Sequence, residues 1–307
     1  MFDNLKEMIP DGCFTSFYEK IKGTNSTKDE EASTNLESPP CNLIIKLANK
    51  SKSVEEFLDE LPTLTQSNIQ NIEHETVGLS NNYMWVLQRK GRLTASNFYS
   101  VFTKVNSIKE DPENACKVEP LIKKIMGYES HYQDIPALKH GHMFEPIARE
   151  KYLSLIKNSH SGFKFRECGL FIDSQKIYLG ASPDLCIDCD CCGSGVAEFK
   201  CPYSIAHEKP TEQNLNYLVS NGSGTTLKRK HPYFAQIQGQ MALTKRKYCD
   251  FFVYTRDGYF QERIHYDPDY WFSLVSSLEY FFHNFLAKEL VFEEVQQKIE
   301  FSKDTES

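Results

Sequence analysis

Residues 183–200 read PDLCIDCDCCGSGVAEFK, and this stretch decides the fold that the sequence predicts. A Pro-Asp pair is followed by a glycine turn and then by an apolar run that carries Glu198 and Lys200. Because side chains at i and i+2 of a strand point to one face, these two side chains are expected to point the same way. A hairpin that folds back at the turn brings Asp184 beside them. The stretch therefore predicts a pocket of two carboxylates and one lysine, which can hold a divalent metal against a phosphate.

The length and composition of the chain predict one main domain with an extension at its N-terminus. The chain has 307 residues, of which 40% are apolar and 25% are charged, enough to bury a large core. We expect an N-terminal extension over residues 1–80, a main domain over 81–290 and a C-terminal tail over 291–307. Residues 22–40 are polar and end in Pro-Pro, which predicts a disordered linker.

Neither a membrane span nor a secretory signal is apparent in the sequence. No apolar run approaches the roughly 18 residues that a span requires, and the N-terminus MFDNLKEMIPDG lacks the basic and apolar regions of a signal peptide. We therefore expect an intracellular protein, in the nucleus or the cytoplasm, that is not secreted. The ten cysteines, four of which fall in residues 186–192, are then expected to be reduced thiols.

The net charge argues against a protein that coats itself with nucleic acid over its whole surface. The formal charge is -7 and the pI is near 5.8, so any contact with phosphate must come from local basic clusters. Two such clusters are residues 89–92 (RKGR) and residues 228–230 (KRK). Taken alone, each cluster is also typical of an ordinary solvent-exposed surface that binds nothing.

The order of predicted elements indicates an α/β fold. Periodicity and capping residues predict helices over 54–61, 82–88, 140–157 and 232–243, with another beginning near Thr94 and a helical tail from Pro268. Alternating and apolar runs predict a three-strand meander over 163–171, 177–179 and 196–201, and a hairpin over 248–255 and 259–265. We expect a central mixed sheet flanked by helices, with the last strand at its edge.

The predicted pocket has the groups that phosphodiester hydrolysis requires. The reaction needs an activated water, neutralised phosphoryl oxygens and a stabilised leaving oxygen, and one or two Mg²⁺ ions held by carboxylates can supply all three. Asp184 and Glu198 are the predicted ligands, and the backbone carbonyl of Phe199 is a further hard donor. Lys200 would orient the attacking water, and Glu145 is a candidate outer ligand. The alternative is an exposed ion pair on a strand face.

These residues resemble the PD-(D/E)XK nucleases, and among them the lambda-exonuclease-like group called YqaJ-like viral recombinases. The resemblance covers about residues 82–256. It rests on five segments in the family's order: Trp85 to Ser96 (WVLQRKGRLTAS), Gly141 with Phe144-Glu145, Ala181 to Asp184 (ASPD), Glu198 to Pro202 (EFKCP) and Tyr233 to Gln240 (YFAQIQGQ).

The resemblance implies a restriction-endonuclease-like core and a set of functional residues. By it, the catalytic residues would be Glu145, Asp184, Glu198, Lys200 and Gln236, and the residues that bind a terminal 5′ phosphate would be Arg89, Ser96 and Ser182. We add as candidate DNA contacts Arg92, Tyr233, Lys228, Arg229 and Lys230. Arginine offers a bidentate fork to phosphate, and small hydroxyls can donate at close range.

The resemblance also implies an activity, a cofactor and a partner. The expected protein is a Mg²⁺-dependent exonuclease, with Mn²⁺ as a substitute, that resects duplex DNA ends from 5′ to 3′ for recombination or repair. An endonuclease on the same core and a catalytically inactive DNA-binding module are the alternatives. A homo-oligomer and a single-strand annealing or recombination partner stay open, whereas no membrane is expected to be involved.

Two other groups of residues in the sequence are of types that bind metals, although the nuclease resemblance does not call for them. Cys186, Cys189 and Cys192 have C-x-x-C spacing, which would suit zinc or an iron–sulfur cluster if Cys168 or Cys201 completed it. Adjacent Cys191 and Cys192 would seldom both face one ion, so we expect reduced cysteines in a turn. His140 and His142, close to Glu145, could form a zinc site, but we expect phosphate contacts or no role for them.

Overall fold

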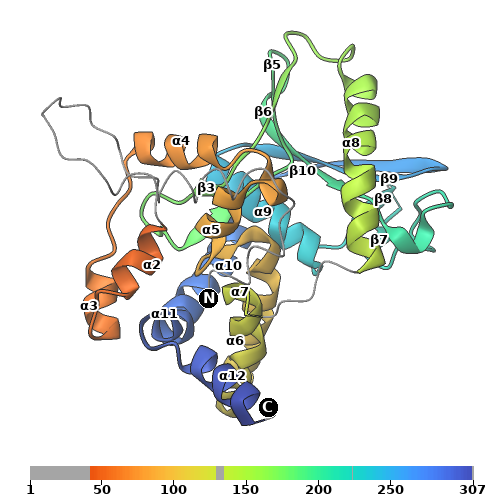
Figure 1. Ribbon diagram of the computed structural model, residues 1–307. Coiled ribbons are helices and arrows are strands. Elements are labelled where there is room, and N and C mark those ends of the chain that lie inside the picture. Colours follow the sequence, from red (N-terminus) through yellow and green to blue (C-terminus); the bar gives the residue numbers. More distant parts are fainter. Residues whose placement is uncertain (1–41, 129–134, 223, 306–307) are drawn as a thin grey trace, which may run out of the picture. The chain divides into compact units, whose positions relative to one another are not determined.

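The computed structural model describes residues 42–128, 135–222 and 224–305 (Figure 1). The linker predicted over residues 22–40 lies outside these ranges. The described residues belong to the unit Pro40–Ser307.

The main sheet has five strands and is mixed, as the sequence predicts. Its order is β10-β9-β6-β5-β2, and its strands are β2 (Lys164–Glu167), β5 (Leu185–Cys189), β6 (Gly193–Lys200), β9 (Tyr248–Thr255) and β10 (Gly258–His265). Strands β6 and β9 are parallel, and the other neighbouring pairs are antiparallel. Strand β10 lies at the edge, as expected for the last strand of the chain.

Two smaller sheets complete the strand content of the described residues. One has the order β1-β4-β3, formed by β1 (Leu93–Thr94), β3 (Phe171–Ile172) and β4 (Leu179–Ala181). The other pairs β7 (Leu218–Ser220) with β8 (Thr225–Leu227). Strand β4 leads directly through Ser182 and Pro183 to Asp184 and β5, so the Pro-Asp pair lies where the chain passes from one sheet to the other.

Two helices cover opposite faces of the main sheet, because side chains alternate along its strands. On one face, Ala148 and Tyr152 of α8 (Pro136–Ile156) pack in one cluster with Phe199 of β6. On the other face, Ile237 of α9 (Pro232–Thr244) packs in a cluster with Val196 of β6. Glu198 and Lys200 have the parity of Val196, so they point toward α9.

The remaining helices build a second core that joins the two ends of the described chain. They are α2 (Leu43–Ala48), α3 (Val54–Asp59), α4 (Gln66–Glu75), α5 (Tyr83–Arg89), α6 (Phe98–Glu110), α7 (Glu119–Met126), α10 (Pro268–Phe281), α11 (Ala287–Phe292) and α12 (Glu294–Thr305). Ile44 and Phe57, both 0% exposed, share this core with Phe282 and Leu290. The boundary expected at residue 81 therefore does not separate the N-terminal helices from the core.

The three-strand meander predicted over 163–171, 177–179 and 196–201 is wrong, because β5 lies between β2 and β6 and strand β4 belongs to the smaller sheet. Three single elements also differ from the prediction. Strand β5 was not expected, because its two cysteines and Asp188 mask a run that is buried on both faces. The chain after Thr94 first makes a 3₁₀ turn, and α6 begins only at Phe98. Helix α8 begins at Pro136 rather than His140, since a proline in the first turn needs no hydrogen-bond partner for its nitrogen.

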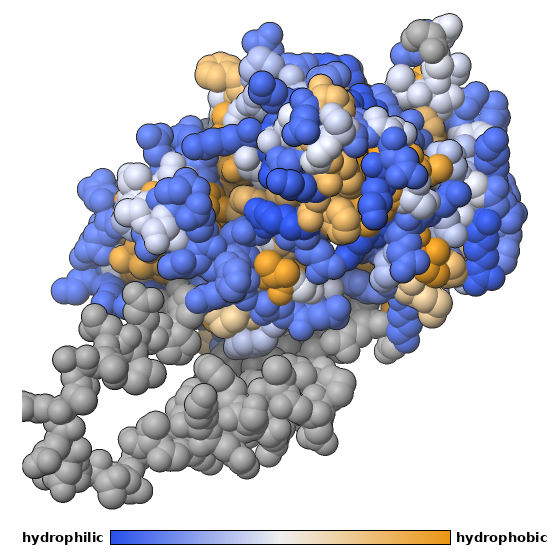
Figure 2. Space-filling model, turned by 90° about the horizontal axis from the view of Figure 1, so that it is seen from above, coloured by the Kyte–Doolittle hydropathy of each residue, from blue (hydrophilic) through white to orange (hydrophobic). Residues whose placement is uncertain are grey.

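The face of the molecule in Figure 2 is mostly hydrophilic, with apolar residues in small groups between the polar ones. Every helix in the described ranges is too short or too polar to cross a lipid bilayer.

Candidate active site

Glu198 is the most buried charged group of the predicted pocket. It lies on β6, is 2% exposed, and accepts hydrogen bonds at both of its carboxylate oxygens. Lys200 Nζ donates to Oε1 at 2.5 Å, and Gln236 Nε2 donates to the same oxygen at 2.6 Å. Gln240 Nε2 donates to Oε2 at 2.7 Å. A buried carboxylate with this many donors is held in one orientation.

Asp184 lies beside Glu198, as the hairpin argument predicts. Its Oδ2 accepts a hydrogen bond of 2.6 Å from the backbone N–H of Phe199, the residue between Glu198 and Lys200. Burial raises the pKa of Asp184 well above its ordinary value, and the negative charges of Glu198 and Glu145 raise it further. The positive charge of Lys200 lowers the pKa of Asp184.

Glu145 reaches the same cluster from α8. Burial and the charge of Glu198 raise its pKa, whereas Arg149 and Lys200 lower it. Arg149 Nη2 lies 3.5 Å from Glu145 Oε1. Three carboxylates from one helix, one loop and one strand therefore act electrostatically on one another, although they are separated along the chain.

Lys200 is the cation at the centre of this group. Burial by itself would lower its pKa, but the charges of Glu198 and Asp184 outweigh burial and raise the pKa above the ordinary value. Its Nζ also lies 4.8 Å from the ring centroid of Tyr233. Lys200 is therefore protonated at neutral pH and cannot serve there as a general base.

The donor set suits a hard divalent cation. With all three carboxylates ionised, Lys200 leaves two negative charges in excess, and this repulsion adds to burial in raising the pKa of Asp184 and Glu145. Carboxylate oxygens are the ligands that Mg²⁺ prefers. Within the described ranges, the three carboxylates are not a group whose ligand atoms all lie within 4.8 Å of one another. The assignment of Asp184 and Glu198 as inner ligands and of Glu145 as an outer ligand stays a prediction.

Gln240 is a site residue to which the sequence analysis assigned no role. It is 0% exposed and holds Glu198 from the second oxygen, one helical turn beyond Gln236. Its own Oε1 is buried and has no hydrogen-bond partner among the described residues. An unpaired buried acceptor of this kind can take a hydrogen bond from a water in the pocket. In the sequence, the i, i+4 spacing of Gln236 and Gln240 places both side chains on one face of the helix, and this spacing could have identified Gln240 as a site residue.

The predicted phosphate-binding residues form a second group that adjoins Asp184. The Arg89 guanidinium lies over the Trp85 ring, 4.0 Å from its centroid, and Arg89 Nη2 is 3.4 Å from Ser96 Oγ. Trp85 Nε1 donates to Ser182 Oγ at 2.8 Å, and Ser182 is two residues before Asp184. Burial lowers the pKa of Arg89 to about 10, which keeps it positively charged at neutral pH.

Arg92 does not belong to that group. It is 1% exposed, and its guanidinium donates to the carbonyl oxygen of Ile177 at 2.9 Å and also to the Gln88 carbonyl. The structure thus corrects the prediction that Arg92 contacts DNA. The cluster of basic residues at 89–92 concealed this, because a sequence gives no signal that one arginine of a charged run is buried.

The basic run of residues 228–230 is exposed and partly engaged. Lys228 Nζ donates to the Asn216 carbonyl at 2.5 Å, and Arg229 pairs with Asp267 at 2.6 Å. Arg229 and Lys230 line a hollow of about 310 Å³ with Tyr99 and Tyr270. Their predicted contacts with a DNA backbone stay a prediction.

The other candidate metal ligands named from the sequence, Cys168, Cys201 and His140, do not lie with the cysteines near the β5–β6 turn. Cys168 is buried with its Sγ 3.1 Å from Cys186 Sγ, and this pair is separate from the cysteines of the turn. His140 packs its ring on Phe144, with centroids 4.4 Å apart. Burial raises the pKa of Cys201, next to Lys200, to about 12, which keeps it a neutral thiol. Neither Cys168 nor Cys201 completes a site with the cysteines of the turn.

The fold and the arrangement of carboxylates and lysine define a protein of the PD-(D/E)XK nuclease superfamily. The family model of the YqaJ-like viral recombinase domain matches residues 84–247. This chain belongs to that family, and the resemblance found in the sequence is confirmed.

Solved structures are also similar to this chain. An alkaline exonuclease from Laribacter hongkongensis is 25% identical over 72% of this chain and 96% of its own, with a TM-score of 0.46. A phage-related exonuclease from Haemophilus somnus 129PT is 14% identical over 66% and 96%, with a TM-score of 0.45. The Shutoff and Exonuclease Protein of Kaposi's sarcoma-associated herpesvirus is 12% identical over 72% of each chain, with a TM-score of 0.41. No curated protein matches the sequence.

Proposed function

We propose that the protein is a Mg²⁺-dependent exonuclease that hydrolyses duplex DNA from an end, in the 5′ to 3′ direction. The observation that carries this proposal is the convergence of Asp184, Glu198 and Lys200 in one hydrogen-bonded group, with Glu145 acting on them from α8. Membership of the YqaJ-like family supports a nuclease that acts on DNA.

In the proposed reaction, the chain's residues hold the cation, position water and balance charge. Asp184 and Glu198 would bind Mg²⁺, with the Phe199 carbonyl as a further donor and Glu145 in the outer shell. Bound there, Mg²⁺ would polarise the phosphate and make the attacking water more acidic. Lys200 donates one of its three hydrogens to Glu198, which leaves two to orient that water and offset developing negative charge.

The proposed end specificity depends on the group formed by Arg89, Trp85 and Ser182. Arg89 is stacked on Trp85, and Trp85 is hydrogen-bonded to Ser182, so the arginine is linked by contacts to the loop that carries Asp184. A guanidinium held in this way can bind a terminal phosphate with two hydrogen bonds. A terminal phosphate bound there would place the adjacent phosphodiester bond near the carboxylates.

Cleavage of labelled DNA tests the proposal. Purified protein is incubated with a 5′-phosphorylated linear duplex and with a closed circle, each with Mg²⁺ and with chelator. We expect Mg²⁺-dependent release of nucleotides from the linear duplex alone, lost in Glu198→Gln and retained in the control Glu279→Gln, whose carboxylate pairs with Lys176 outside the site. Cutting of the circle would instead identify an endonuclease. Binding of DNA without cleavage in Mg²⁺ or Mn²⁺ would identify an inactive DNA-binding module.

A further inference from the structure

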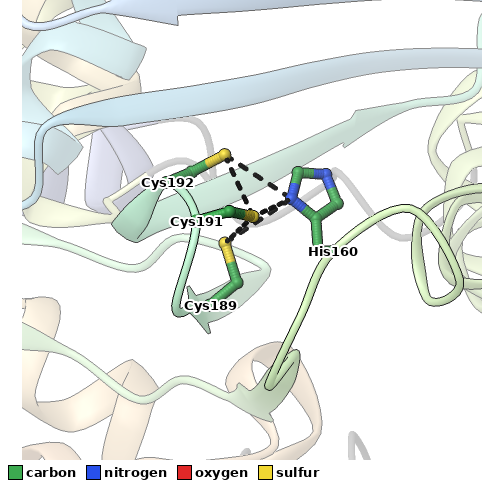
Figure 3. Close-up of side chains that lie close together, drawn as sticks. All are labelled: His160, Cys189, Cys191 and Cys192. Atoms are coloured by element: carbon green, nitrogen blue, oxygen red, sulfur yellow. Dashed lines mark hydrogen bonds between the residues drawn. The ribbon is translucent and has the colours of Figure 1, made fainter.

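A second cluster of metal-ligand types lies at the turn between β5 and β6 (Figure 3). Cys189 is the last residue of β5, Cys191 and Cys192 follow it in the turn, and His160 comes from the loop between α8 and β2. The ligand atoms of these four residues all lie within 4.8 Å of one another. Among the described residues, no other group of three or more His, Cys, Asp or Glu residues has ligand atoms this close together.

Five of the six separations among the four atoms are close to the edges of a tetrahedral site, and the sixth, between Cys189 Sγ and Cys192 Sγ, is at most 4.8 Å. His160 Nδ1 lies 3.2 Å from Cys191 Sγ and 3.5 Å from the Sγ atoms of Cys189 and Cys192. Cys191 Sγ lies 3.6 Å from Cys189 Sγ and 3.7 Å from Cys192 Sγ. A zinc tetrahedron with Zn–S of about 2.3 Å and Zn–N of about 2.0–2.1 Å has edges of about 3.8 Å between sulfurs and about 3.5 Å from sulfur to nitrogen. The five observed separations agree with these edges.

The thiols are not joined to one another. The separations of 3.6 and 3.7 Å between sulfur atoms are well beyond a disulfide bond, which is about 2.05 Å long. All three sulfurs instead lie toward one imidazole nitrogen (Figure 3). The sequence argument against a metal was that adjacent cysteines seldom face one ion, but the tight turn directs both Cys191 and Cys192 to His160.

The histidine loop is fixed against the turn by contacts other than the four ligands. The backbone N–H of Asp190 donates to the Ser161 carbonyl at 2.9 Å. Gly162 has a φ of +60°, and a Cβ at this position would collide with the Asp190 carboxylate. The position of His160 opposite the cysteines is therefore set by the backbone and does not depend on the side chains alone.

We propose that Cys189, Cys191, Cys192 and His160 bind one Zn²⁺ ion as a structural site. Three thiolates and one imidazole form a closed tetrahedral set, which leaves no open position for a substrate and is typical of structural zinc. Soft sulfur ligands exclude Mg²⁺ from this site, just as the oxygen ligands around Glu198 disfavour zinc there. Three thiolates with Zn²⁺ would carry one net negative charge.

The proposed zinc would tie together the elements that carry the carboxylates. His160 follows α8, which carries Glu145, and the cysteines join β5, which begins after Asp184, to β6, which carries Glu198. Cys189 lies five residues beyond Asp184 along the chain, about 16 Å at the usual rise per strand residue. The zinc is thus too distant to take part in the chemistry, and its role is to fix the hairpin to the end of α8. This inference is independent of the proposed function.

Metal content and cobalt spectroscopy test the site. Full-length protein purified with Zn²⁺ present and then desalted is expected to hold one zinc per chain by elemental analysis. The double variant Cys191→Ser with Cys192→Ser should hold less than a fifth of that amount, and the control Cys116→Ser, an exposed cysteine elsewhere, should hold all of it. Zinc retained at full occupancy in the double variant, or absent from the parent protein, would overturn the proposal.

Cobalt provides a readout that needs no variant, in case the double variant does not fold. Wild-type protein loaded with Co²⁺ should show thiolate-to-metal charge-transfer absorption, which the oxygen ligands of the carboxylate cluster cannot produce. Stoichiometric Zn²⁺ should abolish that absorption, whereas excess Mg²⁺ should not. A cobalt-loaded protein without the absorption would contradict a thiolate site. Chelation of the zinc should also lower the midpoint of thermal unfolding, because the binding energy of a structural zinc is part of the folding energy.

Discussion

Gln240 donates a hydrogen bond from Nε2 to Oε2 of Glu198 at 2.7 Å, and thereby ties helix α9 to the carboxylate of β6. Gln236, one turn earlier, donates to Oε1 at 2.6 Å. The orientation of Glu198 is thus set by two amides of one helix as well as by its own strand. The glutamines are positioning residues, since they act on the cation and the water through Glu198.

Removal of the Gln240 amide should impair cleavage more than DNA binding. Hydrogen bonds to charged groups are worth about 1.5–3 kcal/mol, so Gln240→Leu should lower the cleavage rate about 10- to 100-fold. Cleavage at saturating Mg²⁺ is compared with duplex binding in chelator, and the exposed Gln213→Leu serves as control. An equal loss of cleavage and of binding would mean that Gln240 supports the fold rather than Glu198.

Lys200 should act on the reaction rather than on the affinity for DNA. We expect Lys200→Ala to lower cleavage by about 10²- to 10³-fold, the usual effect of removing one group that stabilises transition-state charge. Binding of duplex should change little. Lys176→Ala, which loses only the pair with Glu279, is the matched control. A variant that cuts at the parental rate would remove Lys200 from the mechanism.

Arg89 should discriminate between the two kinds of 5′ end. In Arg89→Ala, the rate on 5′-phosphorylated duplex should fall about 10- to 100-fold, since a charge-assisted hydrogen bond of about 1.5–3 kcal/mol is lost. The rate on 5′-hydroxyl duplex should fall much less. Equal losses on the two substrates would show that Arg89 does not anchor the end.

Asp267 makes stability depend on pH at the start of α10. Its carboxylate accepts from the Tyr270 N–H at 2.9 Å and pairs with Arg229, and these contacts lower its pKa below the ordinary 3.8. A lowered folded-state pKa gives stability that is present above 3.8 and is lost as pH falls through the folded value. Asp267→Ala should therefore cost about 1 kcal/mol at neutral pH and less in acid. Urea unfolding at the two pH values measures the difference, and a constant cost at both would refute the assignment.

Local sequence rules predicted the part of the site that lies within one hairpin. The i, i+2 rule placed Glu198 and Lys200 on one face, where Lys200 now donates to Glu198, and the fold-back placed Asp184 at the Phe199 N–H. The main helices and the β9–β10 hairpin followed from periodicity and turn residues in the same way.

Contacts between distant segments could not be obtained in that way. His160 meets the cysteines only because the end of α8 packs beside the β5–β6 turn, and no sequence spacing encodes this. Arg92 likewise has the sequence context of a surface residue, and only the structure shows that backbone carbonyl oxygens surround its guanidinium. In both cases the decisive partners are set by tertiary packing rather than by local pattern.

Direct measurement of ion binding tests the central claim, that Asp184, Glu198 and their neighbours hold a divalent cation. Mn²⁺, a paramagnetic substitute for Mg²⁺, is titrated into zinc-loaded wild type, Asp184→Asn and the control Glu279→Gln, and free Mn²⁺ is followed by electron paramagnetic resonance. We predict Mn²⁺ binding to wild type and control, displaced by excess Mg²⁺, and affinity at least about tenfold weaker in Asp184→Asn. Equal affinity in all three proteins would contradict the account.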